Sequence, residues 1–162
     1  MKRSTPSRYV SSQPFAPETL DIGCVGYPSV LREFEVETER RTQVVDVTDR
    51  VRDVLGEGNG ASAALVYVPH TTAGVTINEH IDPDLKQDFE MALEQIVADQ
   101  WGWRHEDVDG PNAPSHVRGS LIGPQVLVPL REGSLALGTY QGIFFCEFDG
   151  PRRRKVYVTP LA

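Results

Sequence analysis

Acidic and mostly apolar side chains alternate strictly along the stretch REFEVETE, residues 32–39. A period of two places successive side chains on opposite faces of a strand, with one face buried and the other in water. This pattern is typical of antiparallel sheets, because parallel strands covered on both faces are more continuously apolar. The stretch therefore predicts an antiparallel strand, and we expect ordered structure to begin near Leu31.

Working outward from this stretch, the rest of the chain contains more predicted strands than helices. Residues 63–68, AALVYV, are continuously apolar, which favours a central place in a sheet. The strands predicted near the C-terminus are short and separated by glycines and prolines, and this spacing favours antiparallel pairing. Besides residues 32–39, the predicted strands cover residues 43–47, 63–68, 73–79, 125–130, 135–137, 141–148 and 154–159.

Helical patterns are confined to three segments. The clearest helix follows Asp82, a good N-cap residue, with Pro83 at its first position. Apolar side chains at helical spacing continue this helix to about Asp99. Two shorter helices are predicted over residues 48–55 and 113–121. The sequence therefore predicts an α+β fold, a compact β-rich domain with a mostly antiparallel sheet and two or three helices.

The composition is that of an ordinary soluble globular protein, and 162 residues favour one domain. The 16 Lys and Arg against 23 Asp and Glu give a net charge of −7, which argues against a nucleic-acid partner. No run approaches the roughly 20 apolar residues that span a bilayer, which argues against a membrane partner. Two cysteines are too few for a disulfide scaffold and indicate a reducing compartment, so we expect a cytoplasmic protein.

The first residues differ from the rest of the chain. Their basic and serine-rich composition is similar to that of a transit peptide, but Pro6, Pro14 and Pro17 would break the amphipathic helix that such a peptide needs. No apolar segment typical of a secretory signal is present. We therefore predict that residues 1–28 form a poorly ordered N-terminal extension and that residues 29–162 form a single domain.

Acidic residues and histidines gather in one part of the sequence. Residues 79–109 hold ten acids against Lys86 and Arg104. All four histidines lie in or beside this segment: His70, His80, His105 and His116. Imidazoles and carboxylates together suit zinc or a similar divalent ion. No two histidines are four residues apart, so such a site would be assembled across several elements. The alternative is a solvated helix face with scattered surface histidines.

Three smaller patterns also bear on function. His70 follows a predicted strand and precedes two threonines, so it can bind metal or phosphate or simply end a turn. Glu147 shares strand parity with Ile143 and Phe145, and a glutamate among apolar side chains needs a partner. The basic run at residues 152–155 lies on a strand, where at most two members can face one anion. The alternative for that run is a charged edge strand that resists aggregation.

Several segments together resemble a known family. They are HTTAGVTINE at residues 70–79, Asp82-Pro83, Trp103-Arg104-His105, residues 112–123 around His116, and LGTYQGIFFCEFDGPR at residues 137–152. In this order they are similar to the YjbQ-like family, which is described as having secondary thiamine-phosphate synthase activity. The resemblance runs from about Leu31 to the C-terminus. The departures are Tyr140 where tryptophan is usual, His80 where asparagine is common, and Arg118 where lysine is common, which changes the geometry of the charge.

The resemblance implies a compact α+β fold and a homotrimer. It also favours three histidines as ligands of a divalent metal, zinc or magnesium: His70, His105 and His116. Three such ligands and an open position would describe a catalytic metal site. His80 is left out of this set.

The resemblance further implies catalytic and substrate-binding residues. Glu79 would be the acid or base and Gln141 a polar wall of the site. Because Glu79 shares strand parity with Val75 and Ile77, we expect its side chain on the apolar side, where partial desolvation suits proton transfer. The alternative is a surface acid. The implied substrate-binding residues are Thr71, Thr72, Asn78, Arg118 and Arg152, of which the two arginines would hold phosphate.

The implied reaction joins a hydroxymethyl-pyrimidine diphosphate to a thiazole phosphate and releases pyrophosphate. Cationic side chains or a bound metal would offset the charge on the departing group. Trp103 or Tyr140 would stack on the flat pyrimidine. Two other functions fit the same residues: a metal-dependent hydrolase of a small phosphorylated or acylated compound, and a non-catalytic trimer that binds metal or ligand.

Overall fold

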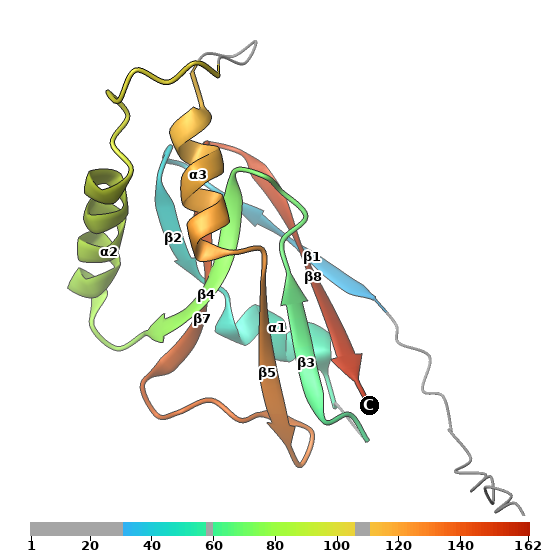
Figure 1. The fold of residues 1–162 in the computed structure, drawn as a ribbon. Helices are drawn as coiled ribbons and strands as arrows, with labels where there is room; N and C mark the ends of the chain where they lie inside the picture. The colour runs from blue at the N-terminus through green and yellow to red at the C-terminus, as the bar shows by residue number, and fades with distance from the viewer. Residues whose placement is uncertain (1–30, 58–59, 106–110) are drawn as a thin grey trace, which may run out of the picture.

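The computed structural model describes residues 31–57, 60–105 and 111–162. The extension predicted for residues 1–28 lies outside these ranges. Within them the chain forms eight strands and three helices, and all strand pairs are antiparallel. Figure 1 shows their arrangement, which confirms the predicted α+β fold.

The strands form two sheets. The five-stranded sheet has the order β1-β8-β3-β5-β6, and the three-stranded sheet has the order β2-β7-β4. The strands of the first sheet are β1 (Arg32–Glu37), β8 (Arg153–Leu161), β3 (Ala63–Tyr67), β5 (Gln125–Arg131) and β6 (Ser134–Leu135). Those of the second are β2 (Gln43–Asp46), β7 (Gln141–Glu147) and β4 (Ala73–Glu79). The apolar strand β3 lies between β8 and β5, as its sequence predicts.

The three helices are α1 (Thr48–Leu55), α2 (Pro83–Ile96) and α3 (Ala113–Ile122). Asp82 caps α2 as predicted, because its carboxylate accepts a hydrogen bond from the backbone N–H of Asp84. The helix ends at Ile96 instead of continuing to about Asp99. At Val97 the backbone turns out of the helix, and its carbonyl oxygen accepts a hydrogen bond of 2.6 Å from Arg118.

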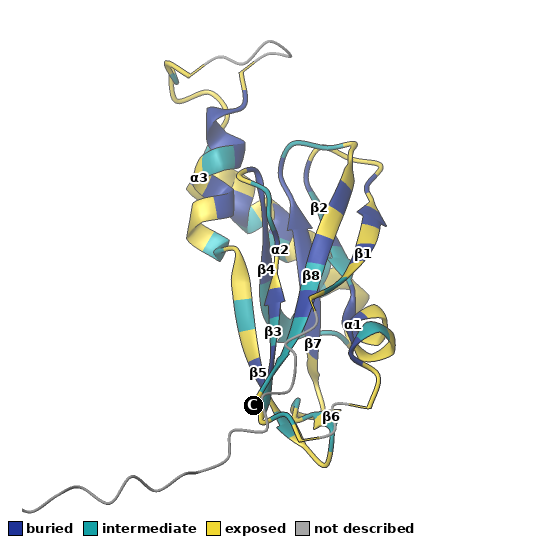
Figure 2. Ribbon diagram, turned by 90° about the vertical axis from the view of Figure 1, so that its right-hand side faces the viewer, coloured by how far each residue is buried: buried dark blue, intermediate teal, exposed yellow. Residues whose placement is uncertain are grey.

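Strand β7 is buried on both faces, which makes it the centre of the fold. Ile143 and Phe145 point into the core between the two sheets, to which α1 also contributes. Phe144, Cys146 and Phe148 pack instead against α2 and α3 on the other face of the second sheet. The strand parity predicted for these residues is therefore confirmed. Figure 2 shows the buried residues concentrated along the inner strands.

Strand β1 has the predicted alternation, with its apolar side chains in the core and its acids outside. The outer acids pair with alternate members of the basic run on β8: Glu33 lies 2.8 Å from Lys155, and Glu37 lies 2.5 Å from Arg153. Because β8 runs between β1 and β3, the edge-strand interpretation of this run is wrong. Arg154 faces inward between its two exposed neighbours.

Among the helices in the described ranges, none has the length and apolar character that crossing a bilayer requires. The apolar surface of α2 and α3 is used instead to cover the second sheet. Leu93 and Phe89 of α2 and Ile122 of α3 make these contacts.

Candidate functional site

A groove of about 500 Å³ lies between α3 and the connection from β3 to β4. Half of its lining residues are glycine or small apolar residues, and the other half are a tyrosine, two histidines, a threonine and a serine. We call it the histidine groove, and its lining residues are Tyr67, Val68, Pro69, His70, Thr71, Ala73, His116, Gly119, Ser120 and Pro124. This volume falls within the usual range for small-molecule sites.

The groove depends on the close approach of α3 to the β3–β4 connection. A Cβ on Gly119 would lie 3.0 Å from the Thr71 carbonyl oxygen, and a Cβ on Gly74 would lie 2.7 Å from the Gly123 carbonyl oxygen. Only glycine leaves room for backbone at these distances. His116 is three residues before Gly119 and therefore lies on the same side of α3. This spacing places His116 across the groove from His70.

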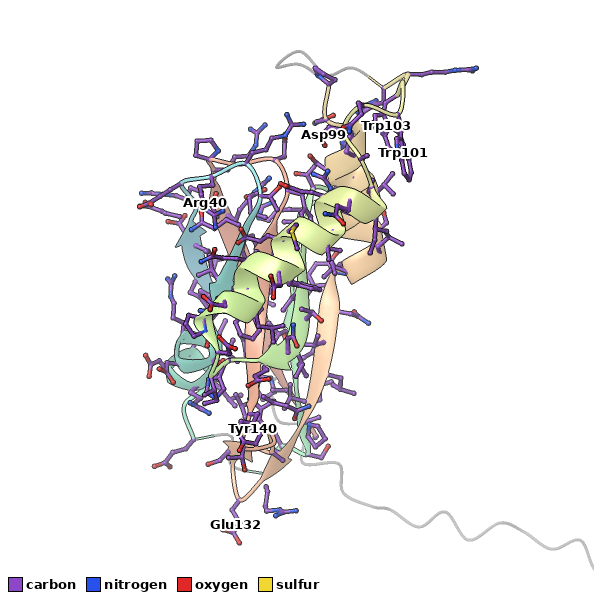
Figure 3. All side chains as sticks on the ribbon, turned by 90° about the vertical axis from the view of Figure 1, so that its left-hand side faces the viewer. Arg40, Asp99, Trp101, Trp103, Glu132 and Tyr140 are labelled. Atoms are coloured by element: carbon purple, nitrogen blue, oxygen red, sulfur yellow. The ribbon has the colours of Figure 1, made fainter. Side chains whose placement is uncertain are left out.

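His105 contacts His116 from the chain that follows α2. Trp101 and Trp103 stack with their ring centroids 5.8 Å apart, and the Trp103 Nε1–H donates to the Ala98 carbonyl oxygen at 3.0 Å. Figure 3 shows this tryptophan pair at the end of the molecule where α3 begins. The rings of His105 and His116 meet edge to face, with centroids 5.1 Å apart. Of the three histidines that the resemblance indicates, His70 and His116 therefore line the groove, and His105 lies against His116.

His70 is held by the backbone of β8. Its Nε2 accepts a hydrogen bond of 2.8 Å from the Lys155 backbone N–H. Strand β3 ends at Tyr67, which is paired with Tyr157 of β8. Beyond this last pair, the His70 imidazole takes the place of a β3 carbonyl as the hydrogen-bond acceptor for β8. Burial of the ring, followed by the neighbouring Arg154 guanidinium, lowers the pKa of His70 below its ordinary value. His70 is therefore neutral near pH 7.

A buried ion pair lies behind His70. Arg154 binds both carboxylate oxygens of Glu147, through Nε and Nη2, each at 2.6 Å. Glu147 is 0% exposed, and it also accepts hydrogen bonds from the backbone N–H groups of Phe148 and Asp149. The partner that the sequence requires for Glu147 is Arg154. The same guanidinium donates to the Thr72 hydroxyl at 2.8 Å, so Thr72 is buried behind the groove while Thr71 lines it.

Glu79 and Gln141 lie together at the other end of the second sheet. They are register partners on β4 and β7, and Asn78 accepts a hydrogen bond from the Glu79 backbone N–H at 2.9 Å. A seven-residue strand is about 20 Å long, so one chain does not bring these residues to the histidine groove. His80 also lies at this end, 3.6 Å from Asp46, and it is outside the groove as expected.

Neither predicted phosphate-binding arginine lines the groove. Arg118 is 1% exposed and points toward the end of α2, where it donates to the Val97 carbonyl oxygen and to Asp99 at 2.7 Å. Arg152 is exposed and donates to Asp149. It lies beside Arg41 in a separate depression of about 340 Å³. Arg41 lies in the short loop between β1 and β2, and no sequence motif identifies it as functional.

The three-histidine metal set fits the structure only in part. The rings of His105 and His116 are near enough for both to reach one ion. The Nε2 of His70 is already engaged by Lys155. In residues 31–57, 60–105 and 111–162, no three His, Cys, Asp or Glu side chains are grouped so that they could hold a metal ion.

His70 is expected to make the fold sensitive to acid. Because its pKa is lower in the folded chain than the ordinary value of 6.5, the unfolded chain takes up this proton at a higher pH. The neutral ring makes its full contribution to the free energy of unfolding at pH values above 6.5. This contribution is lost as the pH falls through the pKa that His70 has in the folded chain. From about pH 7.5 to about pH 5.5, the free energy of unfolding should fall more in the wild type than in His70→Gln. Denaturant titrations at both pH values measure this, and equal losses would contradict it.

The chain is similar in sequence and in structure to known proteins over about four fifths of its length. The sequence profile described as UPF0047 protein YjbQ-like matches residues 32–162. A UPF0047 protein of Methanocaldococcus jannaschii is 40% identical over 130 residues, covering 80% of this chain and 92% of that protein. The UPF0047 protein YugU of Bacillus subtilis is 41% identical over 133 residues, covering 80% and 97%. A crystal structure of a protein from Aeropyrum pernix K1 has a TM-score of 0.76 at 40% identity, covering 82% of this chain and 98% of that one.

Proposed function

This chain belongs to the YjbQ-like UPF0047 family, and from that membership and the histidine groove we propose that it is a transferase that forms thiamine phosphate. The substrates are a hydroxymethyl-pyrimidine diphosphate and a thiazole phosphate. The observation that carries the proposal is the groove lined by His70 and His116, with His105 in ring contact with His116. A small phosphorylated molecule is therefore the expected occupant of that groove.

The reaction requires the protein mainly to position the two substrates and to stabilise the negative charge on the departing pyrophosphate. The thiazole nitrogen forms a bond to the pyrimidine methylene carbon, the carbon–oxygen bond to the diphosphate breaks, and pyrophosphate leaves with that electron pair. The small apolar walls of the groove suit a flat heterocycle. His116, which lines the groove, and His105 beside it would donate hydrogen bonds or a proton to the departing oxygen, a task that histidine performs near neutral pH.

A divalent ion is also part of the proposal. When bound, it would offset the charge that develops on the pyrophosphate. His105 and His116 are the pair that would hold it, and imidazole ligands favour zinc over magnesium. Metal analysis of the purified protein tests this directly, with an ion present in proportion to the chain as the expected result.

We also propose a cytoplasmic location and a homotrimer. The buried, unpaired Cys146, whose pKa burial raises to about 12, suits a reducing compartment. Leu121 of α3 and Leu127 of β5 are each 59% exposed, which supports a surface that another subunit covers.

Light scattering is expected to give a particle of three times the 18.0 kDa mass of one chain. The physical reason is that Leu121 and Leu127 leave water when subunits close into a ring. A monomeric mass would contradict the trimer.

The assay that tests the function supplies both substrates to the purified protein and measures thiamine phosphate. Product formation that requires both substrates is the expected result. Release of phosphate from one substrate alone would favour the metal-dependent hydrolase. Binding without turnover would favour the non-catalytic trimer. Either of these results would overturn the transferase.

A further inference from the structure

His70 differs from His116, the other histidine that lines the groove, because within the described residues its ring nitrogen Nε2 is bound to the backbone of another strand. We infer that His70 serves the groove as a neutral hydrogen-bond donor through its Nδ1–H and is not a metal ligand. This deepens the proposed function, because it assigns His70 to substrate and leaves any divalent ion to His105 and His116.

The tautomer follows from the contact with Lys155. A backbone N–H can only donate, so the Nε2 that accepts from it at 2.8 Å carries no proton. A neutral imidazole has one proton, which must then be on Nδ1. A flipped ring would place a carbon opposite the Lys155 N–H, so the hydrogen bond also fixes the orientation of the ring.

This arrangement leaves neither ring nitrogen ready for a metal. An ion on Nε2 would break the hydrogen bond from the Lys155 backbone N–H. Strand β3 ends at Tyr67, so it has no residue opposite Lys155 that could accept this hydrogen bond instead. An ion on Nδ1 would require the proton on Nε2, where it would face the Lys155 N–H donor. Both routes leave a backbone donor unpaired, and that carries a free-energy penalty.

The segment that carries the ring is bound by two consecutive residues of β8. Lys155 fixes His70 through its backbone, and the preceding residue, Arg154, fixes Thr72 through its side chain. Arg154 is itself bound to the fully buried Glu147. Two consecutive residues of β8 therefore hold both ends of the segment 70–72. The Arg154 guanidinium also disfavours protonation of the ring, and the Glu147 carboxylate offsets only part of that effect.

The chemistry of this end of the groove indicates the group that it would bind. A neutral N–H donor beside the exposed Thr71 hydroxyl, with no carboxylate among the lining residues, suits an acceptor oxygen. In the proposed reaction that acceptor is a phosphoryl oxygen of substrate. His70 would then orient substrate while His105 and His116 act at the leaving group.

Nitrogen-15 NMR of the imidazole nitrogens in the full-length protein tests the inference without any turnover. The His70 signals are assigned by their loss in His70→Gln. We expect Nδ1 to be protonated and Nε2 unprotonated near pH 7.5, and we expect added zinc to leave the His70 signals unchanged. A proton on Nε2, or a His70 nitrogen that zinc shifts as a ligand, would overturn the inference. Because no substrate is used, failure of the transferase proposal leaves this result readable.

Two substitutions of His70 distinguish a role as a hydrogen-bond donor to substrate from a role as a metal ligand. The amide of His70→Asn places an N–H near the position of Nδ1, whereas His70→Gln keeps an acceptor for Lys155 and lacks that donor. We expect both variants to bind zinc as tightly as the wild type, and His70→Asn to retain more thiamine-phosphate formation than His70→Gln. A loss of about tenfold or more in zinc affinity in both variants would show that His70 is a ligand.

Discussion

Replacing Glu147 with glutamine is expected to lower the free energy of unfolding by about 3–5 kcal/mol, because it leaves the buried Arg154 guanidinium without its counter-charge. Glu147 is fully buried, and both of its oxygens bind Arg154 at 2.6 Å. Glutamine has nearly the same shape, so the loss comes from charge and hydrogen bonding and not from packing. Denaturant unfolding at a fixed chain concentration measures the change.

Glu33→Gln is the matched control for this prediction. Glu33 pairs with Lys155 at 2.8 Å on the same strand β8, but both side chains are about half exposed. Exposed ion pairs contribute at most about 1 kcal/mol. Similar small losses in Glu33→Gln and Glu147→Gln would show that the Arg154–Glu147 pair does not support the segment that carries His70.

His116→Gln is expected to lower the turnover number for thiamine-phosphate formation by about 10²-fold or more. His116 lies on the groove wall and contacts the ring of His105, so its loss removes one of the two imidazoles placed at the leaving group. Glutamine keeps the length and polarity of the side chain but cannot exchange a proton near neutral pH. Steady-state kinetics with both substrates measures the effect.

His80→Gln provides the control for this loss. His80 lies beside Asp46 at the far end of β4, so its replacement should leave turnover within about twofold of wild type. If both variants lose activity equally, the effect is structural. If Glu79→Gln is inactive while His116→Gln is not, the active site is at the Glu79 end instead.

Local patterns predicted much of the fold. The alternation in β1 and the parity of Ile143 and Phe145 in β7 both follow from the two-residue period of a strand, and the structure confirms both. The N-terminus of α2 was predicted because Asp82 and Pro83 act within one turn. These features depend on neighbours in the sequence, which is why the sequence alone could predict them.

The features that were missed depend on contacts between distant residues. Helix α2 ends at Ile96, and the next carbonyl oxygen, that of Val97, accepts a hydrogen bond from Arg118, which lies 21 residues further along the chain. The central place of β8 depends on two pairings that no local pattern reveals. The bond between His70 and Lys155 joins residues 85 positions apart, so the sequence could indicate His70 as functional but not which of its nitrogens is available.

The measurement that tests the central claim most directly is NMR shift mapping of thiamine phosphate on the nitrogen-15-labelled protein. The histidine groove predicts shifts at residues 67–71 and 116–120, with little change around Gln141 on β7. Shifts confined to the region around Glu79 and Gln141, with residues 67–71 and 116–120 unchanged, would contradict the assignment of the groove as the substrate site.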